Sequence, residues 1–502
     1  MHSFIGLAPP PEILAGVKSG DISSFCLFAA NNVASPAQLR ALTDALRQAA
    51  AEGDQRQPII GIDQEGGQLQ AITEGCTELP GNMALGATRS PQLARLAGEV
   101  LGRELLAMGI NLNFAPVLDV NVNPDNPAVG TRSFGDDPAL VAELGVALIT
   151  GLQSAGVLAT IKHFPGQGET TTDTHHALPK IKRSLAEMRA VELLPFQQAV
   201  QAGVDAVMST HTIFVALDDH NPATLSPAVM TGLLRDQMAF EGLVITDAMD
   251  MYAVAQFGVV ESITAALAAG VDLVLLGHLP EQLQLNARLK HHVQSQPIAR
   301  IMAAQSKLPT ELLSLDVVGC TQHQTIAQEI ADCSITVVRD NAGRLPLLLA
   351  PDDTIAVITV QPENLTPADT SAAVNIGLAE GVRARHARTL ALEIPRHAST
   401  EMLKMIVAVV AEAKVVVVGT LAADHDPAQA ALVQALVEQR QSPVVVALRT
   451  PYDLLAFPMI DTYLCAYSIR PVATEAVARV LFGEIEAQGQ LPCTIPGLTN
   501  SY

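Results

Sequence analysis

The sequence contains no tryptophan, and aromatic residues make up only 3% of its 502 residues. This is little for a long polysaccharide-binding cleft, whereas a pocket for one small sugar needs few aromatic rings. Charged residues are also sparse, at 16%, while apolar residues reach 49%. This composition excludes a disordered, collagen-like or coiled-coil chain, and it is sufficient for a sizeable hydrophobic core.

Cationic side chains are scarce relative to anionic ones, since 30 Lys and Arg against 51 Asp and Glu give a formal charge of −21. Such a charge repels phosphate backbones and anionic lipids, so the sequence predicts no nucleic-acid partner and no membrane partner. No signal peptide is predicted, and no apolar run is long enough to span a bilayer. We expect a cytoplasmic protein that is a monomer or a weak homodimer.

Several motifs of other protein classes are missing. The six cysteines form no CxxC pair, which argues against a zinc knuckle or a disulfide scaffold and favours small buried thiols in a reducing compartment. The sequence has no GxSxG elbow, no GxxxxGK[ST] phosphate loop and no GxGxxG motif after the first strand of a βαβ unit. A nucleotide function therefore has little support, and we expect neither a cofactor nor a metal ion.

Short apolar, β-rich runs alternate with longer helical patterns over the first 280 residues. The clear runs are residues 24–28, 58–62, 110–117, 157–162, 206–209, 243–246 and 271–276, and residues 4–7 are a weak eighth candidate. Continuously apolar strands that alternate with helices indicate buried parallel strands. The count favours a TIM-like (β/α)8 barrel over residues 1–304.

A second α/β pattern follows the barrel. Residues 305–332 are predicted to be a linker that contains a helix. Five further β-rich runs then occur at residues 335–338, 354–360, 415–419, 444–448 and 463–466. We therefore expect residues 333–502 to form a smaller C-terminal α/β sandwich domain of three layers. The predicted fold class is α/β, with a barrel followed by this domain.

Polar side chains stand at the carboxyl ends of the predicted barrel strands, among them Asp63, Asp119, His163, His211 and Asp247. In a closed parallel barrel these ends lie on one face, so the side chains are expected to meet in one pocket. Asp63 can accept hydrogen bonds from sugar hydroxyls. Asp247 follows four apolar residues and can present a carboxylate to an electrophilic carbon, or it caps the helix that follows.

The segment from Ile161 to His176 has the greatest density of chemically active residues. Asp173 and His175 are two positions apart, so the carboxylate can accept a hydrogen bond from one ring nitrogen and hold the other toward the pocket. This spacing indicates a proton-transfer dyad, although a surface loop that merely contains these residues is an equal alternative. His163, His175 and His176 are also a conceivable zinc site, but no HExxH motif or cysteine pair supports it.

Four segments carry a specific resemblance when they are taken together and in order. They are Asp63-Gln64-Glu65-Gly66-Gly67, Gly130-Thr131-Arg132-Ser133-Phe134-Gly135, the Lys162-His163-Phe164-Pro165-Gly166 loop that ends in Asp173-Thr174-His175, and Ile245-Thr246-Asp247. This set resembles glycoside hydrolase family 3 in its β-N-acetylglucosaminidase branch, since the β-glucosidase branch lacks the Asp-x-His arrangement. Residues 448–453 and 489–492 resemble the family's second domain, so the resemblance covers nearly the whole chain.

The resemblance implies a retaining exo-β-N-acetylglucosaminidase that hydrolyses terminal N-acetyl-β-glucosaminides of chitooligosaccharide or peptidoglycan fragments. It implies a covalent glycosyl-enzyme intermediate on Asp247, with His175 as general acid/base and Asp173 as the carboxylate that orients it. The positions implied to bind the sugar or to lie near it are Asp63, Arg132, Lys162, His163 and His211.

The sequence also departs from the family pattern. Gln68 and Ala71 stand where the family usually has arginine, which removes positive charge near the pocket. Gln167 and Glu169 replace the usual His and Asp of the loop, and Ala248 replaces a common second Asp. Two alternative functions stay open. One is a β-N-acetylglucosaminide phosphorylase, because a histidine acid/base places no negative charge in the path of phosphate. The other is a non-catalytic amino-sugar-binding protein.

Overall fold

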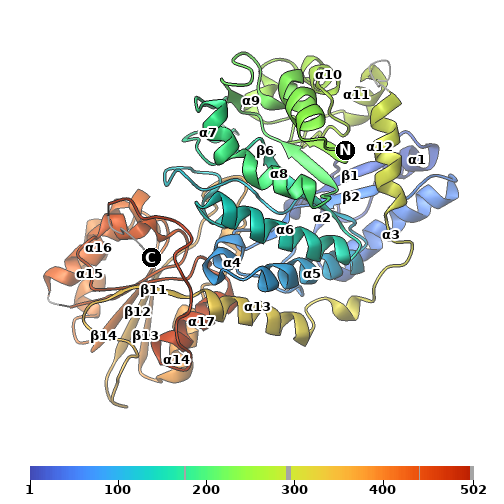
Figure 1. Ribbon diagram of the computed structural model, residues 1–502. Helices are drawn as coiled ribbons and strands as arrows, with labels where there is room; N and C mark the ends of the chain where they lie inside the picture. The colour runs from blue at the N-terminus through green and yellow to red at the C-terminus, as the bar shows by residue number, and fades with distance from the viewer. Residues whose placement is uncertain (175–176, 290–294, 440, 498–502) are drawn as a thin grey trace.

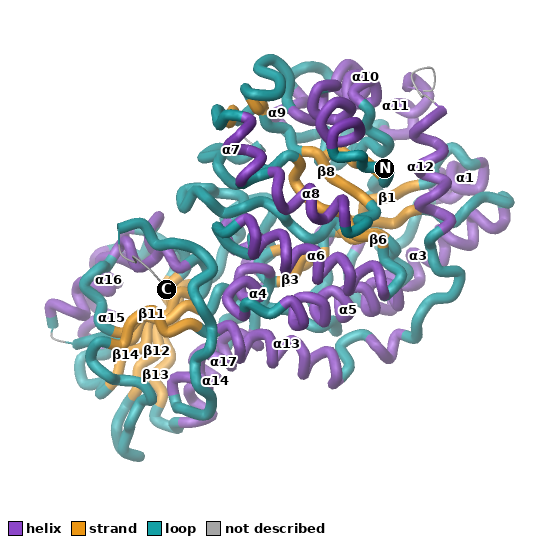
Figure 2. The backbone as a smooth tube through the Cα atoms, in the orientation of Figure 1, coloured by secondary structure: helices purple, strands orange, loops and turns teal. Residues whose placement is uncertain are grey.

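The protein consists of two α/β domains, as the sequence predicts. The structure is a computed structural model that describes residues 1–174, 177–289, 295–439 and 441–497. Each domain contains its own six-stranded sheet, and Figure 2 shows the two groups of strands well apart. Helix α13 (Thr321–Ser334) runs along the junction and packs against helices of both domains (Figure 1).

The sheet of the first domain is parallel. Its strands, in spatial order, are β1 (Ser24–Leu27), β2 (Ile59–Ile62), β5 (Leu112–Asn113), β6 (Leu158–Phe164), β8 (Ala206–Ser209) and β10 (Leu243–Thr246). All their residues are buried, as expected for strands covered on both faces. Six of the seven clear runs in the sequence thus form hydrogen-bonded strands.

Two further segments, residues 1–3 and 273–276, close this sheet into a barrel. The closing contacts are parallel bridges of His2 with Phe25 and of Leu273 with Ile245, and a hydrogen bond of 3.1 Å from Leu276 N to Met1 O. The prediction that residues 4–7 form the eighth strand is wrong. Ile5 is 82% exposed and Gly6 has a φ of 132°, so this segment lacks both the burial and the extended backbone of a barrel strand.

Helices surround the barrel and connect its strands. They are α3 (Pro36–Glu52), α5 (Pro91–Ala107), α6 (Pro138–Ser154), α8 (Leu193–Gln201), the π-helical segment Ala228–Gln237, α10 (Val259–Ala269) and α12 (Ser295–Ser306). Three of them begin in the same way, because Ser35, Ser90 and Asp137 each accept a backbone N–H bond and a proline takes the first helical position. The helical periodicity of the sequence is thus matched by clear start signals.

Shorter elements complete the first domain. The helices are α1 (Pro11–Ser19), α2 (Ala29–Asn32), α4 (Asn82–Thr88), α7 (Leu185–Ala190), α9 (Tyr252–Ala255) and α11 (Gln282–Leu289). Strands β3 (Gln64–Gly66) and β4 (Leu69–Gln70) form an antiparallel hairpin directly after β2, and β7 (Lys180–Ile181) pairs with β9 (Ile213–Phe214). The β3–β4 hairpin stands at the carboxyl end of the barrel and faces the second domain.

The second domain has strand order β11-β16-β15-β14-β12-β13. These strands are β11 (Thr336–Asp340), β16 (Thr462–Cys465), β15 (Val444–Ala447), β14 (Val415–Thr420), β12 (Ile355–Val360) and β13 (Thr389–Ile394), and β11 alone is antiparallel to its neighbour. Helices α14 (Leu378–Arg385), α15 (Thr400–Val409), α16 (Pro427–Glu438) and α17 (Pro471–Leu481) flank the sheet (Figure 1). Strand β13 was not predicted, because it is an edge strand whose residues are mostly half-exposed or exposed.

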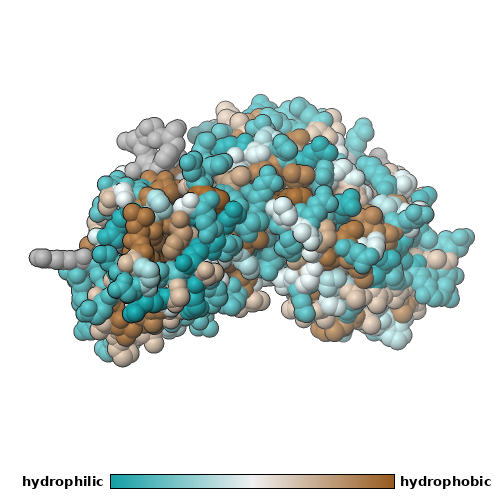
Figure 3. Space-filling model, turned by 90° about the horizontal axis from the view of Figure 1, so that it is seen from below, coloured by the Kyte–Doolittle hydropathy of each residue, from teal (hydrophilic) through white to brown (hydrophobic). Residues whose placement is uncertain are grey.

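The surface and the cysteines agree with a well-filled interior. Seen from below, both lobes carry many hydrophilic residues, and hydrophobic patches lie among these on each lobe (Figure 3). All six cysteines are free thiols, and four of them are buried. No helix in the described parts of the chain is both long and apolar enough to cross a membrane.

Candidate active site

A cavity of about 810 Å3 lies at the carboxyl ends of the barrel strands. The predicted site residues that line it are Asp63, Arg132, Lys162, His163, Asp173 and Asp247. They come from segments far apart in the chain, and the barrel brings them to one place because its parallel strands end on one face. The chemical roles of these residues stay predictions, whereas their convergence is observed.

Two consecutive residues of β6, Lys162 and His163, both line the cavity. Regular strand geometry would point their side chains to opposite faces. The pairing of β6 with β8 shifts register between Ile161 and Phe164, however, and such an irregularity re-aims side chains. The local irregularity of the strand end therefore accounts for two adjacent polar groups in one pocket.

A chain of ion pairs forms the floor of the cavity. Lys162 Nζ lies 2.6 Å from Asp63 Oδ1 and 2.6 Å from Glu65 Oε1. The guanidinium of Arg132 grips the same Glu65 with two bonds, Nε to Oε2 at 2.9 Å and Nη2 to Oε1 at 2.8 Å. Because the carboxylate of Glu65 is shared by two cations, it holds both Lys162 and Arg132 in place beneath the cavity.

The charges of this chain are maintained by one another. Burial raises the pKa of the Glu65 carboxyl, but the adjacent Arg132 and Lys162 outweigh it and lower that pKa to about 2. Burial lowers the pKa of Lys162, and the neighbouring Asp63 and Glu65 carboxylates reverse this and raise it above its usual value. Glu65, Lys162 and Arg132 are therefore all charged at neutral pH. Removing any one of these charges would leave a buried partner unpaired, which is costly.

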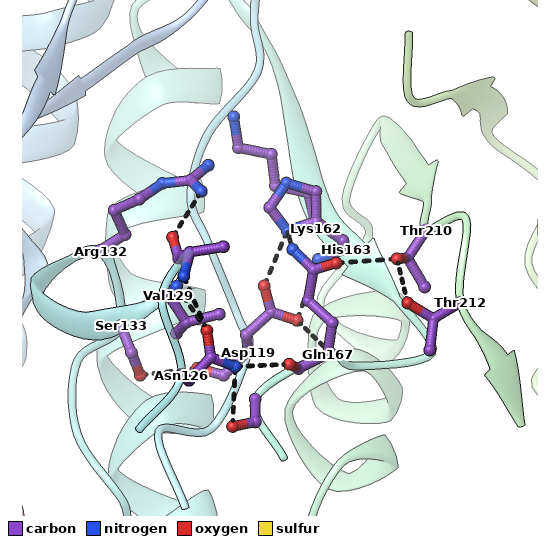
Figure 4. A network of polar contacts seen from close by, with 12 residues as sticks. Asp119, Asn126, Val129, Arg132, Ser133, Lys162, His163, Gln167, Thr210 and Thr212 are labelled. Atoms are coloured by element: carbon purple, nitrogen blue, oxygen red, sulfur yellow. Dashed lines mark hydrogen bonds and ion pairs between the residues drawn. The ribbon is translucent and has the colours of Figure 1, made fainter. Parts of the chain in front are cut away.

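A second buried network orients His163 from below (Figure 4). Asp119 is fully buried, and its Oδ2 lies 2.7 Å from His163 Nδ1. The other oxygen, Oδ1, accepts the backbone N–H of Gln167 at 2.8 Å. The Gln167 side chain lies 3.1 Å from the same ring nitrogen and accepts a bond of 2.8 Å from Thr210. With Nδ1 donating to Asp119, the imidazole keeps Nε2 for the cavity.

Asn126 ties down the base of the loop that leads to Asp173 (Figure 4). Its Nδ2 donates to the carbonyl oxygens of Gln167 at 2.9 Å and Gly168 at 3.0 Å. Its Oδ1 accepts the backbone N–H groups of Ala128 and Val129, both at 2.9 Å. One amide side chain thus links the loop after β5 to the loop after β6.

Gly168 shows how closely these two loops approach. A Cβ atom at this position would lie 1.7 Å from the carbonyl oxygen of Val120. Only glycine fits this contact, so the Gly-rich part of the loop is explained by packing rather than by mobility. Further along, the Asp173 side chain is itself buried where it lines the cavity.

Asp247 immediately follows β10 and is partly exposed to the cavity. Its Oδ1 accepts the backbone N–H of Ala248 at 2.8 Å, and its own N–H donates to Ser209 O at 3.2 Å. These bonds fix the backbone and one carboxylate oxygen. Asp250 has a separate task, since its Oδ2 accepts the N–H of His278 and shapes the turn after residue 276.

His211 is not among the described residues that line the cavity, and its implied place near the sugar stays a prediction. It is fully buried; its Nδ1 lies 2.8 Å from Thr224 Oγ1 and its Nε2 lies 3.0 Å from the carbonyl oxygen of Ala248. The ring therefore supports the backbone next to Asp247.

The predicted acid/base His175, and His176 beside it, lie outside the described residues. The dyad of Asp173 and His175 therefore stays a prediction. In the described ranges, no group of three or more His, Cys, Asp or Glu side chains is arranged to hold a metal ion.

Sequence reasoning missed one wall of the cavity altogether. The wall is segment 364–373 of the second domain, which lines the cavity opposite the barrel. No motif marks this segment, and it reaches the site only because the two domains pack together. The sequence marks Asp119 only as a strand-end residue without a role, and Asn126 carries no signal beyond its place in the loop.

Comparison with known proteins agrees with this architecture. The model of the glycosyl hydrolase family 3 N-terminal domain matches residues 7–310, and that of the family's C-terminal domain matches residues 335–502. A "Beta-hexosaminidase A" of Pseudoalteromonas piscicida is 32% identical, with 97% of this chain and 91% of that protein covered. A "Beta-hexosaminidase" of Chromobacterium violaceum is 39% identical over 49% of this chain and 69% of its own length.

A solved structure extends the similarity to the whole fold. The family 3 β-N-acetylglucosaminidase from Paenibacillus sp. str. FPU-7 superimposes with a TM-score of 0.91 at 34% identity, covering 99% of this chain and 97% of that one. A β-glucoside phosphorylase, BglX, shares the fold at 23% identity and a TM-score of 0.79. Both family models, the full-length relative and this structure agree, so the chain belongs to glycosyl hydrolase family 3 and is a glycoside hydrolase built from that family's two domains.

Proposed function

We propose that the protein is a retaining exo-β-N-acetylglucosaminidase that removes terminal N-acetyl-β-glucosaminyl units through a covalent intermediate on Asp247. The observation that carries the proposal is the convergence of Asp247 and Asp173 on the cavity that also contains Asp63, Lys162 and His163. The similarity to proteins named β-hexosaminidase and β-N-acetylglucosaminidase supports the choice of sugar.

The proposed reaction has two steps. In the first, a carboxylate oxygen of Asp247 attacks C1 of the sugar while the imidazolium of His175 gives its proton to the leaving oxygen. In the second, the same imidazole, now neutral, takes a proton from water, which attacks C1 and releases Asp247. Asp173 would orient the imidazole. The bond from Ala248 N to Asp247 Oδ1 supports the nucleophile assignment, because it holds the carboxylate at the end of β10 beside the cavity.

The floor of the cavity suits a sugar. The Asp63 carboxylate is partly exposed and is fixed by Lys162, so it can accept hydrogen bonds from hydroxyl groups without rearranging. His163 is oriented by Asp119, and Arg132 is oriented by Glu65. A rigid set of donors and acceptors of this kind binds a polar ligand at a small entropic cost.

The test is a covalent trap. A 5-fluoro derivative of N-acetylglucosamine with a good leaving group should add one sugar to the intact protein, and digestion should place the adduct on the peptide that contains Asp247. The Asp247→Ala variant should form no adduct, whereas Asp236→Ala, which changes an exposed aspartate on the outer π-helical segment, should react like the parent.

Kinetics on an aryl N-acetyl-β-glucosaminide complete the assignment. His175→Ala should lower the rate by about 10²–10⁴, the usual contribution of general acid/base catalysis. An adduct on another residue, or full activity of Asp247→Ala, would show that the assignment is wrong. Product analysis with and without inorganic phosphate separates hydrolysis from phosphorolysis, since only the latter yields a sugar 1-phosphate.

A further inference from the structure

The cavity extends beyond the buried strand ends, because other segments of the chain continue its walls. Its inner part is formed by the strand-end residues around Asp63, Lys162 and Asp247. Three further segments continue it outward, namely residues 28–35 after β1, residues 69–74 of the β3–β4 hairpin and its extension, and residues 364–373 of the second domain. Sites for bound small molecules occupy about 300–1,000 Å3, so a volume of about 810 Å3 leaves room beyond one monosaccharide.

The contribution of the second domain to this outer part is firmly held. Thr370 N donates to Gln68 O at 3.0 Å, and Thr370 Oγ1 accepts the N–H of Gln70 at 3.2 Å. Gln68 Nε2 donates in turn to Ala368 O at 3.2 Å. Residues 368 and 370 are therefore hydrogen-bonded to the hairpin, and these bonds hold segment 364–373 against it.

The charges of the cavity are distributed unevenly. Among the described residues that line it, the Lys and Arg side chains are Lys162 and Arg132; both lie in the buried floor and both are already paired with carboxylates. Two histidines also line it, namely His163, which is held by Asp119, and the exposed His278, which contacts the ring of Phe28. The outer part instead has the exposed Glu74, together with Asp369, which is paired with Arg449 behind the wall.

The rest of the outer part is mostly uncharged. Its lining is largely alanine, leucine, valine, proline and threonine, and the whole molecule has a formal charge of −21. An anionic group bound here would lie near Glu74 in a molecule of net negative charge and would find no free lysine or arginine along the described lining.

We propose that this outer part is the leaving-group site and that it selects sugars without negative charge. The leaving group it fits is a neutral amino sugar such as N-acetylglucosamine, and a sugar that bears a carboxylate is disfavoured. This inference rests on the proposed function, because it takes the strand-end residues as the site of the glycosyl unit that is transferred.

Three disaccharides test the proposal at pH 7.5. Each has N-acetylglucosamine joined β-1,4 to a different leaving sugar: N-acetylglucosamine, N-acetylmuramic acid, or the methyl ester of N-acetylmuramic acid. The acid and its ester have nearly the same bulk and differ in charge. We expect kcat/KM for the acid to be about tenfold below that for its ester and for the neutral disaccharide, and we expect the gap to shrink in 0.5 M salt.

Single substitutions locate the effect. Ala71 lines the outer part and is half-buried, so Ala71→Arg should raise kcat/KM for the acid relative to its ester severalfold. Glu74→Gln should change the same ratio in the same direction by a smaller factor, because the side chain is exposed and screened. Gln48→Arg adds an equal charge on the exposed face of α3 and should leave the ratio unchanged.

The wall from the second domain has its own test. Asn364 lines the cavity, and its Oδ1 accepts the N–H of Ala372 at 2.8 Å. Because the amide oxygen is used in this bond, the NH2 group of Asn364 is the part that can donate a hydrogen bond to a sugar. Asn364→Ala should lower kcat/KM for the neutral disaccharide about three- to tenfold more than for an aryl glycoside, whose leaving group is not a sugar.

The outcomes separate this inference from the proposed function. If the aryl N-acetyl-β-glucosaminide is not turned over, both are wrong. If it is turned over but the acid and its ester react equally, or the ester is as poor as the acid, selection by charge is wrong while the proposed function stands. An equal loss on both substrates in Asn364→Ala would remove the second domain from the leaving-group site.

Discussion

At the scale of single residues, the cavity depends on buried carboxylates that never need to touch a substrate. Glu65 holds Lys162 and Arg132, and Asp119 holds His163. A buried carboxylate is costly unless it is fully bonded, and here each one is bonded on both oxygens. Their effect is to fix the direction of the groups above them, so that little reorganisation is needed when a sugar binds.

Asp119→Asn tests this at one position. The amide keeps the size of the side chain but places either a neutral oxygen or an NH2 group beside His163 Nδ1, which weakens the bond or inverts the tautomer of the ring. We expect kcat/KM to fall about 10- to 150-fold, since hydrogen bonds to charged groups contribute about 1.5–3 kcal/mol. The inhibition constant of free N-acetylglucosamine should rise as well, which a loss of folded protein would not cause.

The control for Asp119→Asn is Asp205→Asn. Asp205 precedes β8 at the opposite, amino end of the barrel and pairs with Lys307 at 2.6 Å. Substitutions at that face alter stability rather than catalysis. Unchanged activity and unchanged sugar binding in Asp119→Asn would mean that His163 is oriented by Gln167 instead.

At the scale of elements, two 3₁₀ turns in the second domain place two carboxylates, Asp453 and Asp424, near each other. Asp453, in the turn Pro451–Ala456, is fully buried and accepts the N–H of Ala423 at 2.7 Å. Ala423 begins the turn Ala423–His425, which also contains Asp424. Burial, and then the neighbouring carboxylate of Asp424, raise the pKa of Asp453 from its ordinary 3.8 to about 8.

This shift predicts how stability depends on pH. Because the folded protein binds the proton of Asp453 more tightly than the unfolded chain does, its stabilising effect is complete below about pH 3.8 and is lost as the pH rises to about 8. Asp453→Asn keeps the bond from Ala423 and cannot ionise. Its Tm should therefore exceed that of the parent near pH 8 and fall less between pH 5 and pH 8.

The pH series needs one comparison variant. Asp352→Asn removes an equal charge from an exposed site in the same domain and should leave the Tm profile parallel to that of the parent. If Asp453→Asn were less stable than the parent at pH 8, the carboxylate would be making a favourable interaction in its charged form, contrary to the expected sign.

At the scale of the whole molecule, the domains are joined by buried polar contacts as well as by α13. Arg470 is 1% exposed in its side chain; its Nε donates to Gly67 O at 2.8 Å and its Nη1 to Glu78 Oε2 at 2.7 Å. Its Nη2 donates to Thr370 Oγ1 at 3.2 Å. One arginine of the second domain thus holds the hairpin of the first domain and the cavity wall together.

Arg470→Ala should weaken the contact between the two domains. It leaves the Gly67 carbonyl and the Glu78 carboxylate without their partner, which should destabilise the protein by about 3 kcal/mol and separate calorimetric unfolding into two transitions. Arg385→Ala removes an arginine that pairs with Glu475 and Glu484 inside the second domain and should cost about 1 kcal/mol without splitting the transition. A single, unshifted transition in Arg470→Ala would contradict the role given to it.

Much of this protein is predictable from its sequence because the relevant signals are local. Runs of apolar residues with the period of a buried strand predict β8 and β10 to the residue. Position at the end of such runs, together with the family motifs, identifies the residues of the cavity floor. Both kinds of pattern predict the structure correctly here, because neighbouring residues and the geometry of the barrel decide where these side chains lie.

The remaining features depend on contacts between segments that are distant in the chain. Residues 1–3, rather than 4–7, close the barrel because they meet residue 276, and segment 364–373 becomes a cavity wall because it bonds to the hairpin some 300 positions earlier. The sequence by itself determined the strands and the reactive side chains, and the packing of two domains decided which surfaces face the substrate, because that choice is made by long-range contacts that leave no local pattern.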